Sequence, residues 1–269
     1  MDSAELVERG TILRATVGST VHGLHHGGQD DRDEMAVFVE PPEYLLGLAR
    51  ARGIKGGLYG FEHYVERTQP EGVRSGPGDL DLVAYSLRKY MRLALKGHPT
   101  VLLLLFVPEE LIETKTILGD ELRSLAPAIL SQRAGRGYLG YLHGQKERLL
   151  GVRGQKRVNR PELVEAHGYD TKYAMHAARL GFQGVELLTT RRLDLPIQGE
   201  PADWLRAVRR GDVSFDDWWA RCLDLDAQLA ALADDEAIPP RADRARIDAW
   251  SIDVHQRLWA RTRREAVPE

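Results

Sequence analysis

Three aspartates in the first part of the chain have the spacing of metal ligands. Asp31 and Asp33 are two residues apart, so in an extended strand their carboxylates face the same side. Two adjacent carboxylates repel each other and require a cation between them. Mg²⁺, or Mn²⁺ in its place, suits them because it prefers hard oxygen ligands. Asp81, on a later strand-like run, could share a second ion that activates an attacking oxygen.

A candidate phosphate-binding turn precedes this acid pair. Gly18 and Ser19 end an apolar run at residues 11–17, and their backbone N–H groups and hydroxyl could bind a phosphate, especially if a helix begins near residues 20–24. An acid-x-acid pair alone is more often part of a solvated loop, and Gly-Ser alone is a weaker signal still. The order of strand, Gly-Ser, acid pair, apolar strand and later acid makes the pattern more specific.

A second set of polar side chains lies on one face of a predicted helix at residues 170–189. Lys172, His176, Arg179 and Gln183 follow one another at helical spacing, and Asp170 is suited to cap the helix start. Two cations and an imidazole would neutralise a triphosphate or a departing pyrophosphate. The alternative interpretation, a solvated helix face, remains open from spacing alone.

A basic stretch at residues 131–160 is a candidate for contact with a polynucleotide backbone. It holds eight Lys or Arg residues and one acid, together with Tyr138 and Tyr141. A solvated helical face rich in arginine is the alternative. An acidic segment at residues 216–236 offsets its charge.

The secondary-structure elements predicted to position these residues are mixed strands and helices in the first part of the chain and helices alone in the rest. Short apolar runs predict strands at residues 11–17 and 35–39, and residues 81–85 could form a third strand or the start of a helix. Residues 53–78 are interpreted as a long insertion. Helices are predicted at residues 86–96, 116–131, 135–151, 170–189, 203–210, 214–233 and 243–263, with no further strand after residue 110. We therefore expect an α/β catalytic domain over residues 1–115 and an all-α domain over residues 116–269.

Composition excludes several classes of protein. The net charge is −3, which argues against a polybasic protein that coats nucleic acid by charge alone. The single cysteine, Cys222, excludes a disulfide framework. The longest apolar run, residues 101–107, is too short to span a membrane, and the N-terminus lacks the pattern of a signal peptide. These features predict a cytoplasmic protein without a membrane partner.

The motifs together resemble a known family. The segment VGSTVHGLHHGGQDDRDEMAVFV, followed by SGPGDLDL, YSLRKYMRLALKGHPTVLLLLF and RPELVEAHGYDTKYAMHAARLGFQGVELLTT, is similar to nucleotidyltransferases of the DNA polymerase β superfamily. More narrowly, it resembles the YcgL-like and RNA-ligase-associated polymerase β-like group, versions of which are encoded by actinobacterial phages. The resemblance extends from about residue 11 to about residue 190.

The resemblance implies roles for particular residues. Gly18 and Ser19 would face the triphosphate, and Asp31 and Asp33 would bind metal. Asp81 would be the third carboxylate, with Asp79 as its rival. Two Mg²⁺ or Mn²⁺ ions would then support transfer of a nucleoside monophosphate from an NTP to an acceptor hydroxyl. The first candidate acceptor is an RNA 3′ end, and a small molecule or a protein side chain is the alternative.

Two other functions remain open at this stage. The chain could be a catalytically inactive nucleotide- or RNA-binding module that retains the fold, although the presence of all three carboxylates argues against this. Alternatively, His22, His25 and His26 could bind a transition metal with one of the aspartates, as in a metal-dependent hydrolase. Their spacing matches no standard site.

Overall fold

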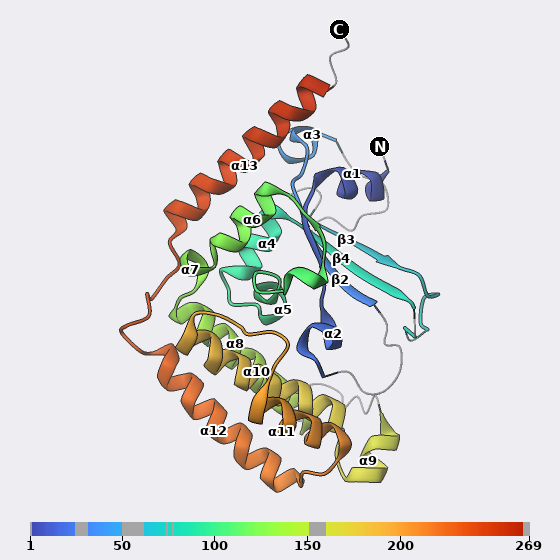
Figure 1. Cartoon of the computed structure of the whole chain (residues 1–269), viewed down its shortest axis with the longest axis vertical. Coiled ribbons are helices and arrows are strands. Elements are labelled where there is room, and N and C mark those ends of the chain that lie inside the picture. The colour runs from blue at the N-terminus through green and yellow to red at the C-terminus, as the bar shows by residue number, and fades with distance from the viewer. Residues whose placement is uncertain are drawn as a thin grey trace. The chain divides into compact units, whose positions relative to one another are not determined.

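The computed structural model describes residues 2–24, 32–49, 62–73, 75–76, 78–150 and 160–265, the last four of these without their side chains. Contacts group the chain into two compact units (Figure 1). Unit 1 contains Met1–Leu93, Leu103–Ile129 and Asp243–Glu269, and unit 2 contains Ala94–Leu102 and Leu130–Ala242. The units alternate along the sequence, whereas the expected division has one boundary, after residue 115. That division into an α/β domain and an all-α domain stays a prediction.

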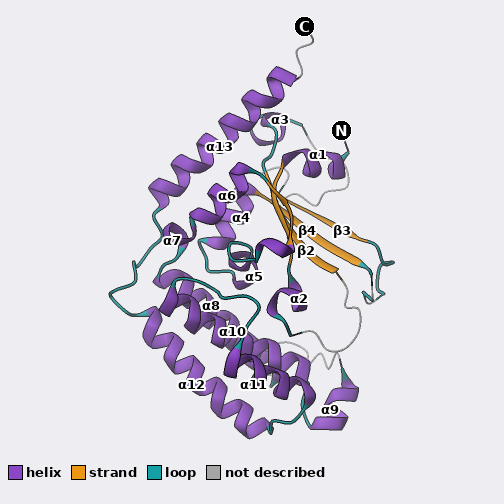
Figure 2. Cartoon of the chain, in the orientation of Figure 1, coloured by secondary structure: helices purple, strands orange, loops and turns teal. Residues whose placement is uncertain are grey.

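The described residues of unit 1 form a mixed five-stranded sheet of order β3-β4-β2-β1-β5 (Figure 2). The strands are β1 (Thr11–Thr16), β2 (Arg32–Phe38), β3 (His63–Arg67), β4 (Leu80–Ser86) and β5 (Ile112–Lys115). β2 and β4 are parallel, and the other neighbours are antiparallel. The strands predicted near residues 11–17 and 35–39 are confirmed, and residues 81–85 form a strand rather than the start of a helix. The prediction of no strand after residue 110 was wrong, because β5 lies at Ile112–Lys115.

Apolar side chains on alternate residues fix which face of the sheet is buried beneath α1 (Ser3–Gly10). Leu6 and Val7 of this helix cluster with Ala36, Phe38, Leu82 and Ala84, the even-numbered residues of β2 and β4. Because successive side chains of a strand point to opposite faces, the odd-numbered residues point away from this cluster. Asp33 and Asp81 therefore lie on the other face of the sheet.

Short helices and the long helix α13 (Arg244–Glu265) complete unit 1. The short helices are α2 (Gly18–His22), α3 (Pro42–Leu45), α4 (Leu87–Ala94), η1 (Glu109–Leu111), α6 (Ile117–Ser124) and α7 (Ala126–Ile129). The chain passes between the units within α4 and within α5 (Pro99–Leu103). α13 belongs to unit 1, although it comes last in the chain. Trp250 Nε1 and Arg257 Nη1 of α13 each donate to the Glu121 carboxylate at 2.8 Å, and Trp259 Nε1 donates to the carbonyl of Glu40 at 2.8 Å.

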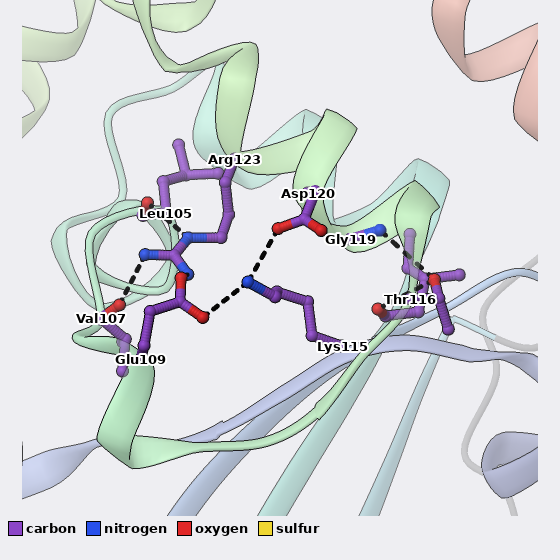
Figure 3. Close-up of polar contacts among 9 residues, drawn as sticks. Leu105, Val107, Glu109, Lys115, Thr116, Gly119, Asp120 and Arg123 are labelled. Atoms are coloured by element: carbon purple, nitrogen blue, oxygen red, sulfur yellow. Dashed lines mark hydrogen bonds and ion pairs between the residues drawn. The ribbon is translucent and has the colours of Figure 1, made fainter.

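Polar side-chain contacts stabilise the segment that leads through β5 into α6 (Figure 3). Lys115 Nζ lies 2.6 Å from Glu109 and 2.8 Å from Asp120, so one ammonium group joins two elements. Arg123 Nη2 donates to the carbonyl of Val107 at 2.7 Å, and Thr116 caps α6 by accepting from the N–H of Gly119 at 3.4 Å. These contacts join the end of β5 and α6 to the segment that precedes β5.

Unit 2 is helical in the part that the structure describes. Its longer helices are α8 (Gln132–Leu149), α10 (Thr171–Thr190), α11 (Gly199–Arg210) and α12 (Phe215–Ala233), and α9 (Pro161–His167) is a short helix that the sequence did not predict. α10 packs against α8, α11 and α12. Its Gly184 permits this, because a Cβ there would lie 2.9 Å from Leu229 and 3.2 Å from Tyr138. No helix among the described residues is both long and apolar enough to cross a membrane.

Candidate functional site

Asp33 and Asp81 are direct partners in the parallel pairing of β2 with β4. Register partners on adjacent strands point to the same face, so the sheet brings two carboxylates together on the face opposite the α1 cluster. Both side chains are half-buried. Asp31 lies outside the described residues. The pairing extends to its neighbour, because the N–H of Arg32 donates to the carbonyl of Asp79 at 2.7 Å.

Gly18 packs directly against the carboxylate of Asp33. Antiparallel pairing of β1 with β2 brings the end of β1 beside this aspartate, and the N–H of Val17 donates to the carbonyl of Asp33 at 2.8 Å. Gly18 has φ of +68°, and a Cβ at this position would overlap Asp33 Oδ2 and lie 2.8 Å from its Cγ. The position therefore requires glycine for both its backbone angle and its space. Ser19 follows in α2, so the predicted turn and Asp33 lie together.

Asp81 is held by three side chains from residues 67–75. Arg67 Nε lies 2.8 Å from Oδ1, Gln69 Nε2 donates to the same oxygen at 3.1 Å, and the hydroxyl of Ser75 donates to Oδ2. Partial burial opposes ionisation of Asp81, but these hydrogen bonds and the charge of Arg67 outweigh it and hold its pKa below the ordinary value. Asp81 is therefore a stable anion beside Asp33.

Asp79 takes part in a turn. Its carboxylate accepts from the hydroxyl of Thr68 at 3.0 Å and from the N–H of Gly76 at 2.9 Å. Asp81, by contrast, is the register partner of Asp33. This difference favours Asp81 over Asp79 as the third carboxylate in the proposal below.

A buried acid, Glu34, lies on the face of β2 opposite to Asp33. Glu34 forms ion pairs with Arg14 and with Arg32, the middle residue of Asp31-Arg32-Asp33. Because Arg32 and Glu34 share one face, the side chain of Asp33 between them points to the opposite face. Glu34 was not among the residues predicted from the sequence, although an acid next to an apolar strand is a signal that could have identified it.

Several Lys and Arg side chains of unit 2 lie near the predicted polar face of α10. Lys172, His176 and Arg179 lie close enough that burial and the charges of Arg179, Lys172, Arg160 and Arg209 lower the pKa of His176 to about 3. Burial also lowers the pKa of Arg179 to about 10. Arg160 and Arg209 could not be assigned to this face from spacing along α10, because Arg160 precedes α9 and Arg209 lies in the last turn of α11. The arrangement suits an anion with several negative charges.

Two local expectations for α10 are confirmed. Asp170 caps the helix by accepting from the N–H of Tyr173 at 2.9 Å. Gln183 lies one turn beyond Arg179, and its Oε1 accepts from Arg179 Nη1 at 2.6 Å. The guanidinium is thereby fixed in orientation along the polar face.

A family model matches residues 3–253 of the chain, nearly its whole length, and describes the RNA repair pathway DNA polymerase beta family, RlaP. The chain belongs to this family. The resemblance expected from the motifs is thus confirmed, and membership makes the chain nucleotidyltransferase-like and supports a transferase.

Other comparisons add little to this family assignment. A solved structure of a nucleotidyltransferase-like protein from Exiguobacterium sibiricum 255-15 is similar at 11% identity with a TM-score of 0.29 over 86% of this chain and 71% of that chain. None of the curated proteins compared with the chain matches it.

Part of the basic stretch at residues 131–160 is paired within unit 2 of this RlaP family member. Lys146 Nζ lies 2.7 Å from Asp226, and Arg136 Nη2 lies 2.7 Å from Asp234, so the acidic segment neutralises both. Tyr138 is 1% exposed, so its ring is not available to a polynucleotide, and contact of the rest of the stretch with a polynucleotide stays a prediction. Residues 151–159 lie outside the described residues.

The histidine-cluster hypothesis has one described member. His22 is buried in α2, whereas His25 and His26 lie outside the described residues. Among the residues that the structure does describe, no group of three or more His, Cys, Asp or Glu side chains is placed to hold a metal ion. The aspartate trio itself includes Asp31, which those residues leave out.

His176 is expected to remain neutral far below the pH at which a free histidine gains its proton. Its pKa should lie near 3, so its ring ¹⁵N shifts should stay those of the neutral imidazole from pH 8 to pH 5. The Lys172→Met variant removes one of the neighbouring cations and should raise this pKa. A midpoint near 6.5 in the unaltered chain would contradict both the burial of His176 and the clustering of cations around it.

Proposed function

We propose that the chain is a metal-dependent nucleotidyltransferase that moves a nucleoside monophosphate from an NTP to an acceptor hydroxyl. The observation that carries the proposal is the register pairing of Asp33 with Asp81 beside Gly18. Two carboxylates held on adjacent strands next to a space that only glycine leaves open form an arrangement suited to a cation and a phosphate. Membership of the polymerase β family supports the same chemistry.

The donor set fits Mg²⁺ or Mn²⁺. Asp33 and Asp81 offer hard carboxylate oxygens, and Asp31 would complete a trio able to hold two ions. Once bound, such ions neutralise charge on the triphosphate and lower the pKa of the acceptor hydroxyl. The fit rests on the donor chemistry and on the close contact between Gly18 and Asp33.

The chain's own residues are assigned to binding and proton transfer. Gly18 and Ser19 of unit 1 bind the triphosphate through the turn that follows β1. In unit 2, the polar face of α10 with Lys172, His176 and Arg179 is assigned separately to binding of phosphate oxygens. The acceptor oxygen forms a bond to the α-phosphorus, and the bond from that phosphorus to the bridging oxygen breaks, so pyrophosphate leaves with the electron pair. The proton of the acceptor hydroxyl passes to solvent by way of Asp81.

An RNA 3′ end is the acceptor that we propose first. The matching family is described by an RNA repair pathway, which supports an RNA substrate. Small molecules and proteins are the other acceptors to test.

The decisive experiment offers each α-³²P-labelled NTP with Mg²⁺ or Mn²⁺ and follows the label. The acceptors are RNA with a free 3′ hydroxyl, the same RNA with a 3′ phosphate, total cell protein and a small-molecule extract. Label in the hydroxyl-ended RNA alone, lost on adding EDTA, supports the full proposal. Label only in protein or in the extract would mean that the acceptor is that class of molecule and not RNA. NTP binding without any transfer would overturn the proposed enzymatic activity and favour a nucleotide-binding module.

A further inference from the structure

One row of side chains crosses three neighbouring strands on the aspartate face. Asp33 of β2 pairs with Asp81 of β4, and Asp81 pairs in turn with Arg67 of β3. The guanidinium Nε of Arg67 lies 2.8 Å from Asp81 Oδ1. A positive group of the chain thus contacts one of the oxygens that we assign to metal binding.

Two neutral side chains hold Asp81 in addition to this cation. Gln69 Nε2 donates to Asp81 Oδ1 at 3.1 Å and to the hydroxyl of Ser75 at 2.5 Å, and Ser75 donates to Oδ2. Because the side chains of Gln69 and Ser75 are uncharged, they orient the carboxylate of Asp81 without neutralising its negative charge. The buried Oε1 of Gln69 accepts no hydrogen bond from the described part of the chain. A buried amide oxygen next to a carboxylate suits a cation or a water molecule bound to one.

Arg67 differs from Gln69 and Ser75 because it is easily displaced. Its side chain is 63% exposed, whereas that of Asp81 is 18% exposed. Ion pairs with such an exposed partner are weak, since water screens the attraction and a flexible side chain must be ordered. A divalent ion carries twice the charge of a guanidinium and would repel it at this distance.

We propose that Arg67 is a tethered counter-ion that competes with divalent metal for Asp81 and leaves the carboxylate when metal binds. The inference rests on the proposed function, because it takes Asp33 and Asp81 as metal ligands. Arg67 then neutralises Asp81 while no metal is bound, and it raises the metal concentration that the site requires. Gln69 and Ser75 are positioning residues that keep the carboxylate directed toward the site in both states.

The test measures binding of Mn²⁺ alone to the full chain, without nucleotide, from the electron paramagnetic resonance signal of the free ion. Arg67→Met should lower the apparent dissociation constant about three- to tenfold, because a competing cation is lost. Arg67→Lys retains the charge and should bind Mn²⁺ within about twofold of the unaltered chain. Arg9→Met is the matched control, because Arg9 is 67% exposed and paired with Glu5 on α1.

Different failures of this test point to different errors. If Asp33→Asn and Asp81→Asn both leave Mn²⁺ binding unchanged, the proposed metal site is overturned, and the inference with it. If these variants lose binding but Arg67→Met equals the unaltered chain or binds more weakly, only the competition is overturned. Tighter binding in Arg9→Met as well would show a general charge effect and would also overturn it.

Discussion

Replacing Asp33 with asparagine is expected to abolish nucleotidyl transfer while the chain remains folded. The amide occupies the same volume, and the main-chain bond from Val17 to residue 33 does not involve the side chain. The substitution removes the negative charge of residue 33, which we propose binds the metal, so the rate of transfer should fall by about 10³-fold or more. Single-turnover transfer of labelled nucleotide to the identified acceptor measures the loss, and circular dichroism confirms the fold.

Asp81→Asn should have an effect of similar size, and Asp120→Asn provides the matched control. Asp120 is an exposed carboxylate on α6 of the same unit, and it pairs with Lys115 at the end of β5. Its substitution makes the same chemical change away from the proposed site and should alter the rate by less than about twofold. Full activity in Asp33→Asn would show that the paired aspartates are not the catalytic carboxylates.

Replacing Gly18 with alanine is expected to impair both stability and transfer. The new Cβ would overlap Asp33 Oδ2, so either the aspartate or the turn must move. The φ of +68° adds a backbone cost of roughly 1 kcal/mol for a residue other than glycine. We expect a drop in the melting temperature together with about a 10²-fold loss of transfer, since a displaced carboxylate no longer holds its geometry.

Gly199→Ala separates the two causes of this effect. Gly199 has φ of +67°, nearly that of Gly18, but a Cβ there meets nothing within 4 Å. This control should lose stability without losing the rate of transfer. Equal rates in Gly18→Ala and in the unaltered chain would contradict the close packing of Gly18 on a catalytic Asp33.

Hydrophobic periodicity predicted most of the described elements. The helix expected at residues 170–189 is Thr171–Thr190, because its apolar side chains recur at helical spacing and an aspartate caps its start. β3 and β5 were missed for a physical reason. Both are edge strands whose residues are partly or fully exposed, so they show no alternation of buried apolar side chains.

The candidate site was predictable only where chemistry depends on residue type and local spacing. Gly18, Ser19 and Asp33 were predicted because an acid pair follows a Gly-Ser turn, and Asp81 was predicted from a later strand-like run. The structure places Gly18 and Asp81 beside Asp33. Arg67 was not found, because its contact with Asp81 depends on the register of two strands, β3 and β4. That register is set by packing and pairing across the sheet, which a local sequence pattern does not specify.

The place of α13 in unit 1 has a consequence for synthesis of the chain. Glu40 and Glu121 receive their hydrogen bonds from residues 250–259, which a ribosome adds only after all of unit 2. The helices of unit 2 can therefore pack together before α13, which unit 1 requires, has been synthesised. The usual order, in which the first-made domain matures first, is reversed for the unit that carries the aspartates.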